Sequence, residues 1–196
     1  MIPKIIFHRS WIYDQQWVPL RRKDVEAPTE EQWKERLEQL EKEWPKIAES
    51  VLGEMAAVVK LKWHQSETIC SITCGIGGFS DPLTISYKHD VNLMIDYLVH
   101  ELIHRLLSEE ENKTKTHINF QAIMARYKEY ALKTKGHVII HAIHKHLYLK
   151  FFGGERLQRD IEISEKYPAY RDAWKIVGQE GHEQIISWLI NGVPQP

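Results

Sequence analysis

The residues of this chain that could do chemistry together begin with His100-Glu101-Leu102-Ile103-His104, which has the pattern H-E-x-x-H. If the segment is helical, His100 and His104 lie one turn apart on the same face. Both imidazoles can then bind one zinc ion, and the carboxylate of Glu101 can reach a water on that ion. The pattern therefore predicts a zinc site with a general base beside it, provided that the segment is a helix.

The flanking sequence predicts the helix that this motif needs. Asp90 is a candidate N-cap, and residues 91–99 contain neither glycine nor proline. Apolar residues recur around most of the helix circumference, which is typical of a helix buried in a core. Buried polar groups need partners, and a metal ion would satisfy both imidazoles. The alternative is a pair of core histidines hydrogen-bonded to the backbone, with Glu101 in a salt bridge.

A second histidine-rich segment, residues 137–146, follows the motif at a distance in sequence. In a helix, His137, His141, His144 and Tyr148 fall on one stripe, and the flanking residues are apolar. This arrangement is similar to that of the motif helix, because a narrow row of imidazoles again lies on a helix that is otherwise apolar.

This second segment can supply the third ligand that a catalytic zinc ion usually takes. We expect His141, at the centre of the row, to be that ligand. His137, His144 and Glu129 are the alternatives, because histidine and glutamate are both accepted in this position. The histidines that do not bind the metal would contact the substrate or donate hydrogen bonds in the transition state.

The elements that must position these residues are predicted to form an α+β fold. Thr29, with Gln32 as its capping-box partner, can start a long helix over residues 30–54, and Pro45 kinks it. Short β-rich segments then indicate a small, mostly antiparallel sheet ahead of the motif helix. These strand candidates are residues 56–64, 67–74 and 83–88.

The part of the chain after the motif helix is predicted to be helical. A polar connector is expected at residues 112–117, and glycines at 136 and 178 and Pro168 are expected to separate helices. The predicted helices are residues 118–133, 137–152, 155–165, 170–177 and 181–190. The length favours a single domain over residues 1–196. We divide it into an arm (1–28), the helix, sheet and motif helix (29–108), helices that hold the third ligand (109–152) and a helical tail (153–196).

Composition excludes several classes of protein. The formal net charge is −1, and 27% of residues are charged, so there is no electrostatic case for binding nucleic acid or an anionic membrane. No apolar run is long enough to span a membrane, and the N-terminal apolar stretch is too short for a signal peptide. We expect a cytoplasmic protein with Cys70 and Cys74 as buried free thiols. The oligomeric state is left open.

On the motif His100-Glu101-Leu102-Ile103-His104 and the order of its elements, the chain resembles the zincin metallopeptidases, in a minimal gluzincin-like form. The resemblance implies a Zn²⁺ cofactor and a peptide or protein substrate. It implies that Glu101 takes a proton from the zinc-bound water and passes it to the leaving amine. It also implies that the strand at residues 83–87 lies at the sheet edge and aligns the substrate.

Tyr148 or His144 could stabilise the oxyanion if the two histidine helices face each other. The alternative function is a zinc-binding regulatory or structural protein that cuts no peptide, or only one partner. In that protein four ligands would close the metal site, whereas an enzyme keeps one position open.

Overall fold

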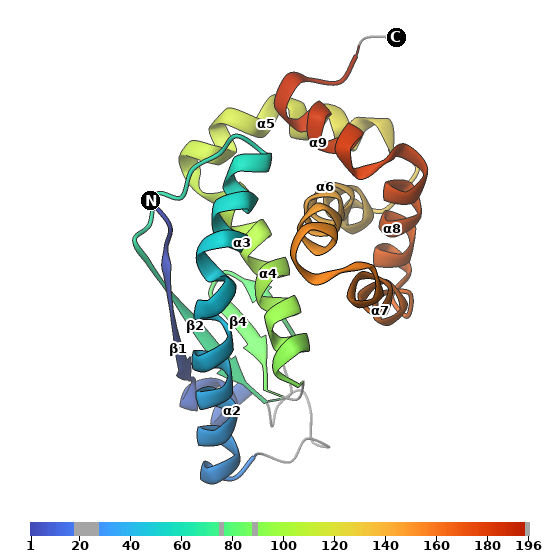
Figure 1. Ribbon diagram of the computed structural model, residues 1–196. Coiled ribbons are helices and arrows are strands. Elements are labelled where there is room, and N and C mark those ends of the chain that lie inside the picture. The colour runs from blue at the N-terminus through green and yellow to red at the C-terminus, as the bar shows by residue number, and fades with distance from the viewer. Residues whose placement is uncertain (18–27, 75–76, 88–89, 195–196) are drawn as a thin grey trace. The chain divides into compact units, whose positions relative to one another are not determined.

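The computed structural model describes residues 1–17, 28–74, 77–87 and 90–194 (Figure 1). It is an α+β structure in which helices predominate, in agreement with the predicted class. The described residues belong to two compact units. The first comprises Met1–Leu52 and Trp63–Arg105, and the second comprises Gly53–Lys62 and Leu106–Pro196.

The first unit contains a four-stranded sheet with the strand order β1-β2-β4-β3. The strands are β1 (Lys4–Arg9), β2 (Glu67–Thr73), β3 (Phe79–Ser80) and β4 (Leu83–Ser86). Strand β2 is parallel to both β1 and β4, and only β3 runs antiparallel to its neighbour β4. The predicted mostly antiparallel sheet is therefore wrong. Strand β1 lies in the predicted arm, so a strand precedes the long helix that was predicted over residues 30–54.

The strand predicted at residues 56–64 is absent, although its burial pattern resembles that of a strand. Its first residues belong to a helix that ends at Val58. Leu61 and Trp63 are buried while Lys62 and His64 are exposed, so side chains alternate as they would in a strand, but no ladder forms. Alternation reports which side chains are buried, and it does not show that a partner strand is present.

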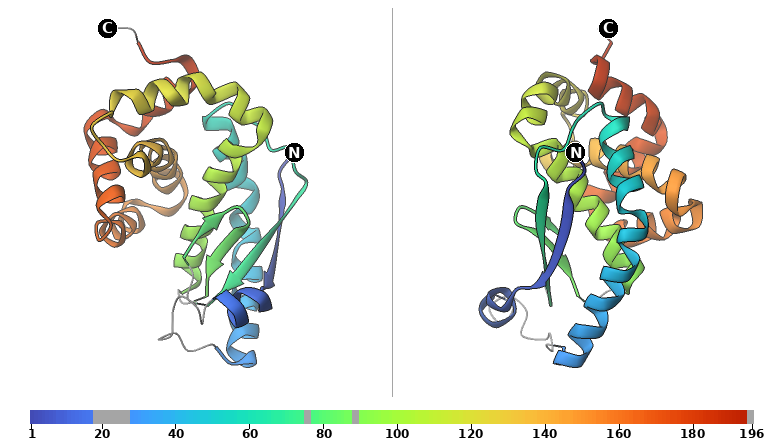
Figure 2. Two further views of the ribbon diagram at one scale, coloured as in Figure 1. Left: turned by 180° about the vertical axis from the view of Figure 1, so that it is seen from behind. Right: turned by 60° about the vertical axis from the view of Figure 1, so that its left-hand side comes forward.

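One face of the sheet is apolar because alternate residues of each strand point to the same side. This face carries Ile5, Phe7, Cys70, Ile72 and Ile85, all of them buried. Helices α2 (Glu30–Glu43) and α4 (Val91–Ser108) lie on the same side of the sheet (Figure 2).

Helices α2 and α4 of the first unit begin where the sequence predicts. Thr29 accepts a hydrogen bond from the backbone N–H of Gln32, whose side chain accepts one from the backbone N–H of Thr29, so the predicted capping box is present. At the predicted kink, α2 ends at Glu43 and α3 (Pro45–Val58) begins, while Trp44 between them keeps helical dihedral angles. Within the predicted arm, a π-helical turn η1 (Tyr13–Trp17) follows β1, and residues 18–27 lie outside the described residues.

The second unit is helical. It contains α5 (Glu110–Arg126), α6 (Leu132–Leu147), the π-helical turn η2 (Tyr148–Phe152), α7 (Gly154–Ser164), α8 (Pro168–Glu180) and α9 (His182–Asn191). Helix α6 packs against α8 and α9, and α5 packs against α9. None of the helices in the described part of the chain is both long and apolar enough to cross a membrane.

Several predicted boundaries in this unit are wrong. Residues 112–117 are not a connector but part of α5, and Gly136 and Gly178 lie inside helices α6 and α8. Glycine costs a helix about 1 kcal/mol, which tertiary packing offsets readily. The breaks predicted after residue 152 and before the helix at 181–190 are present, at Gly153 and Gly181, where φ is 85°, a conformation that favours glycine over other residues.

Candidate metal site

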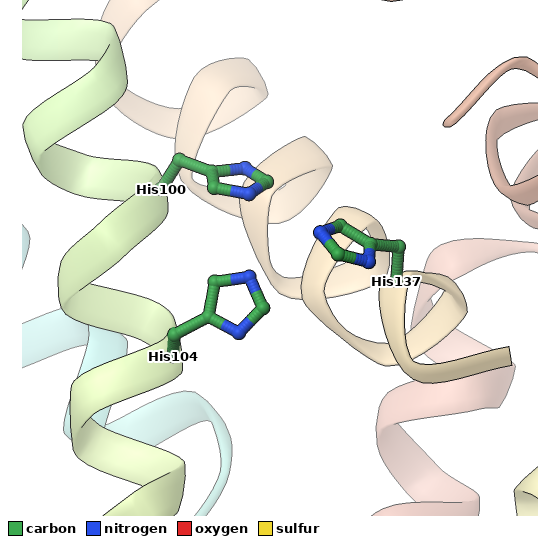
Figure 3. Close-up of side chains that lie close together, drawn as sticks. All are labelled: His100, His104 and His137. Atoms are coloured by element: carbon green, nitrogen blue, oxygen red, sulfur yellow. The ribbon is translucent and has the colours of Figure 1, made fainter. Parts of the chain in front are cut away.

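Helix α4 carries the two histidines of the H-E-x-x-H motif on one face. The side chain of Asp90 accepts a hydrogen bond from the backbone N–H of Leu93 at 3.0 Å, so the predicted N-cap is present. The rings of His100 and His104 project from the helix in the same direction (Figure 3). Their centroids are 5.1 Å apart, with an interplanar angle of 61°. Both side chains are half-buried.

His137 is the third histidine of the cluster. One potential ligand atom from each of His100, His104 and His137 lies within 4.8 Å of the other two (Figure 3). His137 is on helix α6, in the segment from which the sequence predicted the third ligand, but it was named there as an alternative to His141. These three histidines could hold a metal ion.

The environment of His137 within α6 suits a metal ligand. Its Nδ1 lies 2.8 Å from the carbonyl oxygen of Lys133, so Nδ1–H can donate to that oxygen and leave the Nε2 lone pair available. Burial lowers the pKa of His137, which favours the neutral form that binds metals. The ring also packs against Tyr170, with centroids 4.6 Å apart.

Glu101 is buried beside the two motif histidines, with 8% of its surface exposed. The backbone of Gly78 passes so close that a Cβ at this position would lie 2.4 Å from Glu101 Oε1. On the core side of the sheet, burial raises the pKa of the Cys70 thiol, and the negative charge of Glu101 raises it further. Cys70 and Cys74 are free and buried, as predicted.

The other predicted site residues lie along the stripe of α6 and η2. His141 is 2% exposed and stacks on Trp174 of α8, with centroids 4.2 Å apart and an interplanar angle of 16°. His144 is 1% exposed, and its Nδ1 lies 3.8 Å from Asp160 Oδ2 of α7. The rings of His144 and Tyr148 are 4.5 Å apart, and Tyr148 is fully buried.

Aromatic residues of α8 that pack against this stripe were not predicted from the sequence. Tyr170 and Trp174 are four residues apart, so they share one face of α8, and that face meets the imidazole row of α6. The spacing of four residues between Tyr170 and Trp174 could have indicated this aromatic face from the sequence. Glu129, the carboxylate alternative for the third ligand, is exposed in the turn between α5 and α6.

The donor set fits a transition metal. Three imidazoles and no carboxylate favour zinc, copper, nickel or iron over magnesium or calcium. Nitrogen atoms on a tetrahedral zinc ion with ordinary Zn–N bonds lie about 3.3 Å apart. The potential ligand atoms of the cluster all lie within 4.8 Å of one another, a limit that is wider than this spacing.

The comparisons with known proteins add no family to this description. No protein-family model matches the sequence, and neither a curated protein nor a solved structure matches the chain.

Proposed function

We propose that this protein is a zinc-dependent metallopeptidase in which His100, His104 and His137 bind the metal and Glu101 is the general base. The observation that carries the proposal is the cluster of His100, His104 and His137, with the carboxylate of Glu101 next to His100 on the same helix, α4. The resemblance of this motif to that of zincins supports peptides as the substrate class. A cytoplasmic location remains our expectation.

The number and type of ligands support an enzyme over a structural zinc protein. The cluster found among the described residues has three histidines, and a catalytic zinc ion has three protein ligands and one open position. Zinc held there would lower the pKa of a bound water toward neutrality and polarise the scissile carbonyl. A closed structural site would need a fourth ligand from the protein.

The roles of the chain's own residues follow from their surroundings. Glu101 would accept a proton from the attacking water and deliver it to the leaving amine, and its burial strengthens its interactions with charge that develops nearby. The hydrogen bond to Lys133 would keep His137 in the tautomer that binds through Nε2. His144 and Tyr148 remain our candidates for stabilising the oxyanion.

The Glu101→Gln variant tests the proposal. It keeps the size of the side chain but removes the base, so we expect unchanged zinc stoichiometry and a loss of peptide hydrolysis of about 10²–10⁴-fold. Cleavage of a peptide library by the zinc-loaded protein, read by mass spectrometry, provides the assay. The matched control is Glu111→Gln, because Glu111 is exposed on α5. Full activity in Glu101→Gln would exclude Glu101 as the base.

A further inference from the structure

Two residues of α4 reach the same short segment of the sheet. Glu101 and Arg105 are four residues apart, so their side chains leave the helix on the same face, one turn apart. Glu101 lies against Gly78, and Arg105 contacts Ser80 and Asp81. The segment from 78 to 81, which includes strand β3, therefore runs along this face of α4.

Arg105 ties the segment to the helix through several groups. Its Nη1 donates to the carbonyl oxygen of Ser80 at 3.2 Å and lies 3.6 Å from Asp81 Oδ1, while its Nη2 donates to Gln65 Oε1 at 2.9 Å. The Arg105 side chain is 19% exposed. Because a guanidinium group is planar and its donors point in fixed directions, these contacts define where Ser80 lies relative to α4.

The backbone of Gly78 lies directly against the Glu101 side chain. A Cβ on Gly78 would lie 2.4 Å from Oε1, 3.0 Å from Cδ and 3.1 Å from Cγ of Glu101. Only a residue without a side chain allows this approach, and the contact limits the rotation of Glu101 toward β3. The neighbouring Gly77 is different, because a Cβ there would meet no atom within 4 Å.

We propose that Arg105 and Gly78 are positioning residues for Glu101. Arg105 holds β3 against α4, and Gly78, next to β3, fixes the side chain of Glu101 in the orientation that a general base needs. The catalytic consequence rests on the proposed function, whereas the Gly78–Glu101 contact is a property of the fold. A general base must lie within hydrogen-bonding reach of its proton, and a displacement of about 1 Å can cost 10²-fold in rate.

The variants Gly78→Ala and Gly77→Ala form a matched pair. In the zinc-loaded protein we expect Gly78→Ala to lower kcat by about 10²-fold. KM and the zinc affinity, measured by competition with a chelator, should change by less than about 3-fold, because the substitution displaces Glu101 and removes none of the three histidines. Gly77→Ala should keep the kcat of the wild type. Equal kcat in both variants would overturn the proposal.

A double-mutant cycle measures the same contact without any activity. Gly78→Ala should lower the melting temperature by a few degrees in the wild-type background, because the new methyl group displaces Glu101. In a Glu101→Ala background the methyl group has room, so Gly78→Ala should have little effect. If the shift is the same in both backgrounds, Gly78 does not act on Glu101.

Arg105→Gln and Arg105→Lys test the other half of the proposal. Removal of the guanidinium in Arg105→Gln should speed hydrogen exchange in the peptide that covers residues 77–81 and lower kcat about 10-fold, with KM unchanged. Arg105→Lys, which keeps the charge, should recover part of both effects. Unchanged exchange in Arg105→Gln would refute the role of Arg105.

The two proposals fail in different ways. If the zinc-loaded wild type hydrolyses no peptide, the proposed function fails. In that case the double-mutant cycle and the hydrogen exchange decide the positioning inference by themselves, because neither requires a substrate.

Discussion

His137 lies one turn after Lys133 in helix α6, and its Nδ1 is 2.8 Å from the Lys133 carbonyl oxygen. A ligand histidine commonly makes such a bond, since it fixes the ring and reserves the other nitrogen for the metal. His141, one turn further along, instead stacks on Trp174. The two histidines therefore share a stripe but differ in their surroundings, and this difference leads to a direct test of the third ligand.

We predict that His137→Ala weakens zinc binding by more than about 100-fold, because loss of a ligand should exceed the 10–100-fold cost of losing a supporting hydrogen bond. His141→Phe should bind zinc as the wild type does, since phenylalanine keeps the stacking on Trp174. Zinc affinity by chelator competition gives the comparison. The opposite result, with His141→Phe impaired and His137→Ala intact, would restore His141 as the ligand that the sequence favoured.

Local features of this chain were predictable because they depend on neighbours in sequence. The preference of helix N-termini for capping side chains accounts for the Thr29 capping box and the Asp90 cap. Helix periodicity accounts for the shared face of His100 and His104. The helix that contains the motif therefore begins where its sequence predicts.

Features that depend on distant pairing were not predictable in the same way. Strand β1 pairs with β2 across a separation of more than sixty residues, with Lys4 opposite Glu67, and the pairing is parallel. Alternation along a strand is the same for parallel and antiparallel neighbours, so the order and direction of strands could not be read from it. Strand β4, which we expected at the edge by analogy with zincins, lies between β2 and β3.

The histidine that completes the cluster with His100 and His104 was not predictable for a related reason. The stripe from His137 to Tyr148 was evident from spacing, but its surroundings depend on α8, which supplies Tyr170 and Trp174. No pattern within α6 distinguishes a histidine that stacks on tryptophan from one that is available to a metal.

The acid stability of the second unit should depend on Glu54, at the C-terminal part of α3. Hydrogen bonds from Lys150 and then from His146, at 2.6 Å and 2.7 Å, hold the pKa of Glu54 below its ordinary value of 4.5. Because the folded-state pKa is lowered, the stabilisation is fully present above pH 4.5 and is lost as the pH falls through the folded-state value.

We therefore predict that Glu54→Gln lowers the stability at neutral pH by about 1 kcal/mol, as expected for a partly exposed ion pair. The difference in free energy of unfolding between this variant and the wild type should decrease as the pH falls below 4.5. Urea unfolding at several pH values measures it. The control is Glu49→Gln, because Glu49 is exposed on the same helix, and this variant should have the same free energy of unfolding as the wild type. If the difference in free energy of unfolding between Glu54→Gln and the wild type does not depend on pH, this account of Glu54 is wrong.

Asn112 connects three parts of the second unit from within α5, in a segment whose polar character suggested a connector. Its Nδ2 donates to the carbonyl oxygens of Leu106, at 2.9 Å, and Lys62, at 2.7 Å, and its Oδ1 accepts from the Lys62 N–H at 3.4 Å. The residue is 3% exposed. Leu106 lies in the last turn of α4, where carbonyl oxygens have no partner within the helix and need one elsewhere.

We predict that Asn112→Ala lowers the free energy of unfolding by about 2 kcal/mol, because it leaves the Leu106 carbonyl buried without its hydrogen bond. Asn191→Ala is the control, since Asn191 is exposed at the end of α9, and its effect should stay within about 0.5 kcal/mol. Chemical denaturation of both variants gives the comparison, with zinc affinity measured alongside. If Asn112→Ala has the same free energy of unfolding as Asn191→Ala, the hydrogen bonds of Asn112 do not stabilise the second unit.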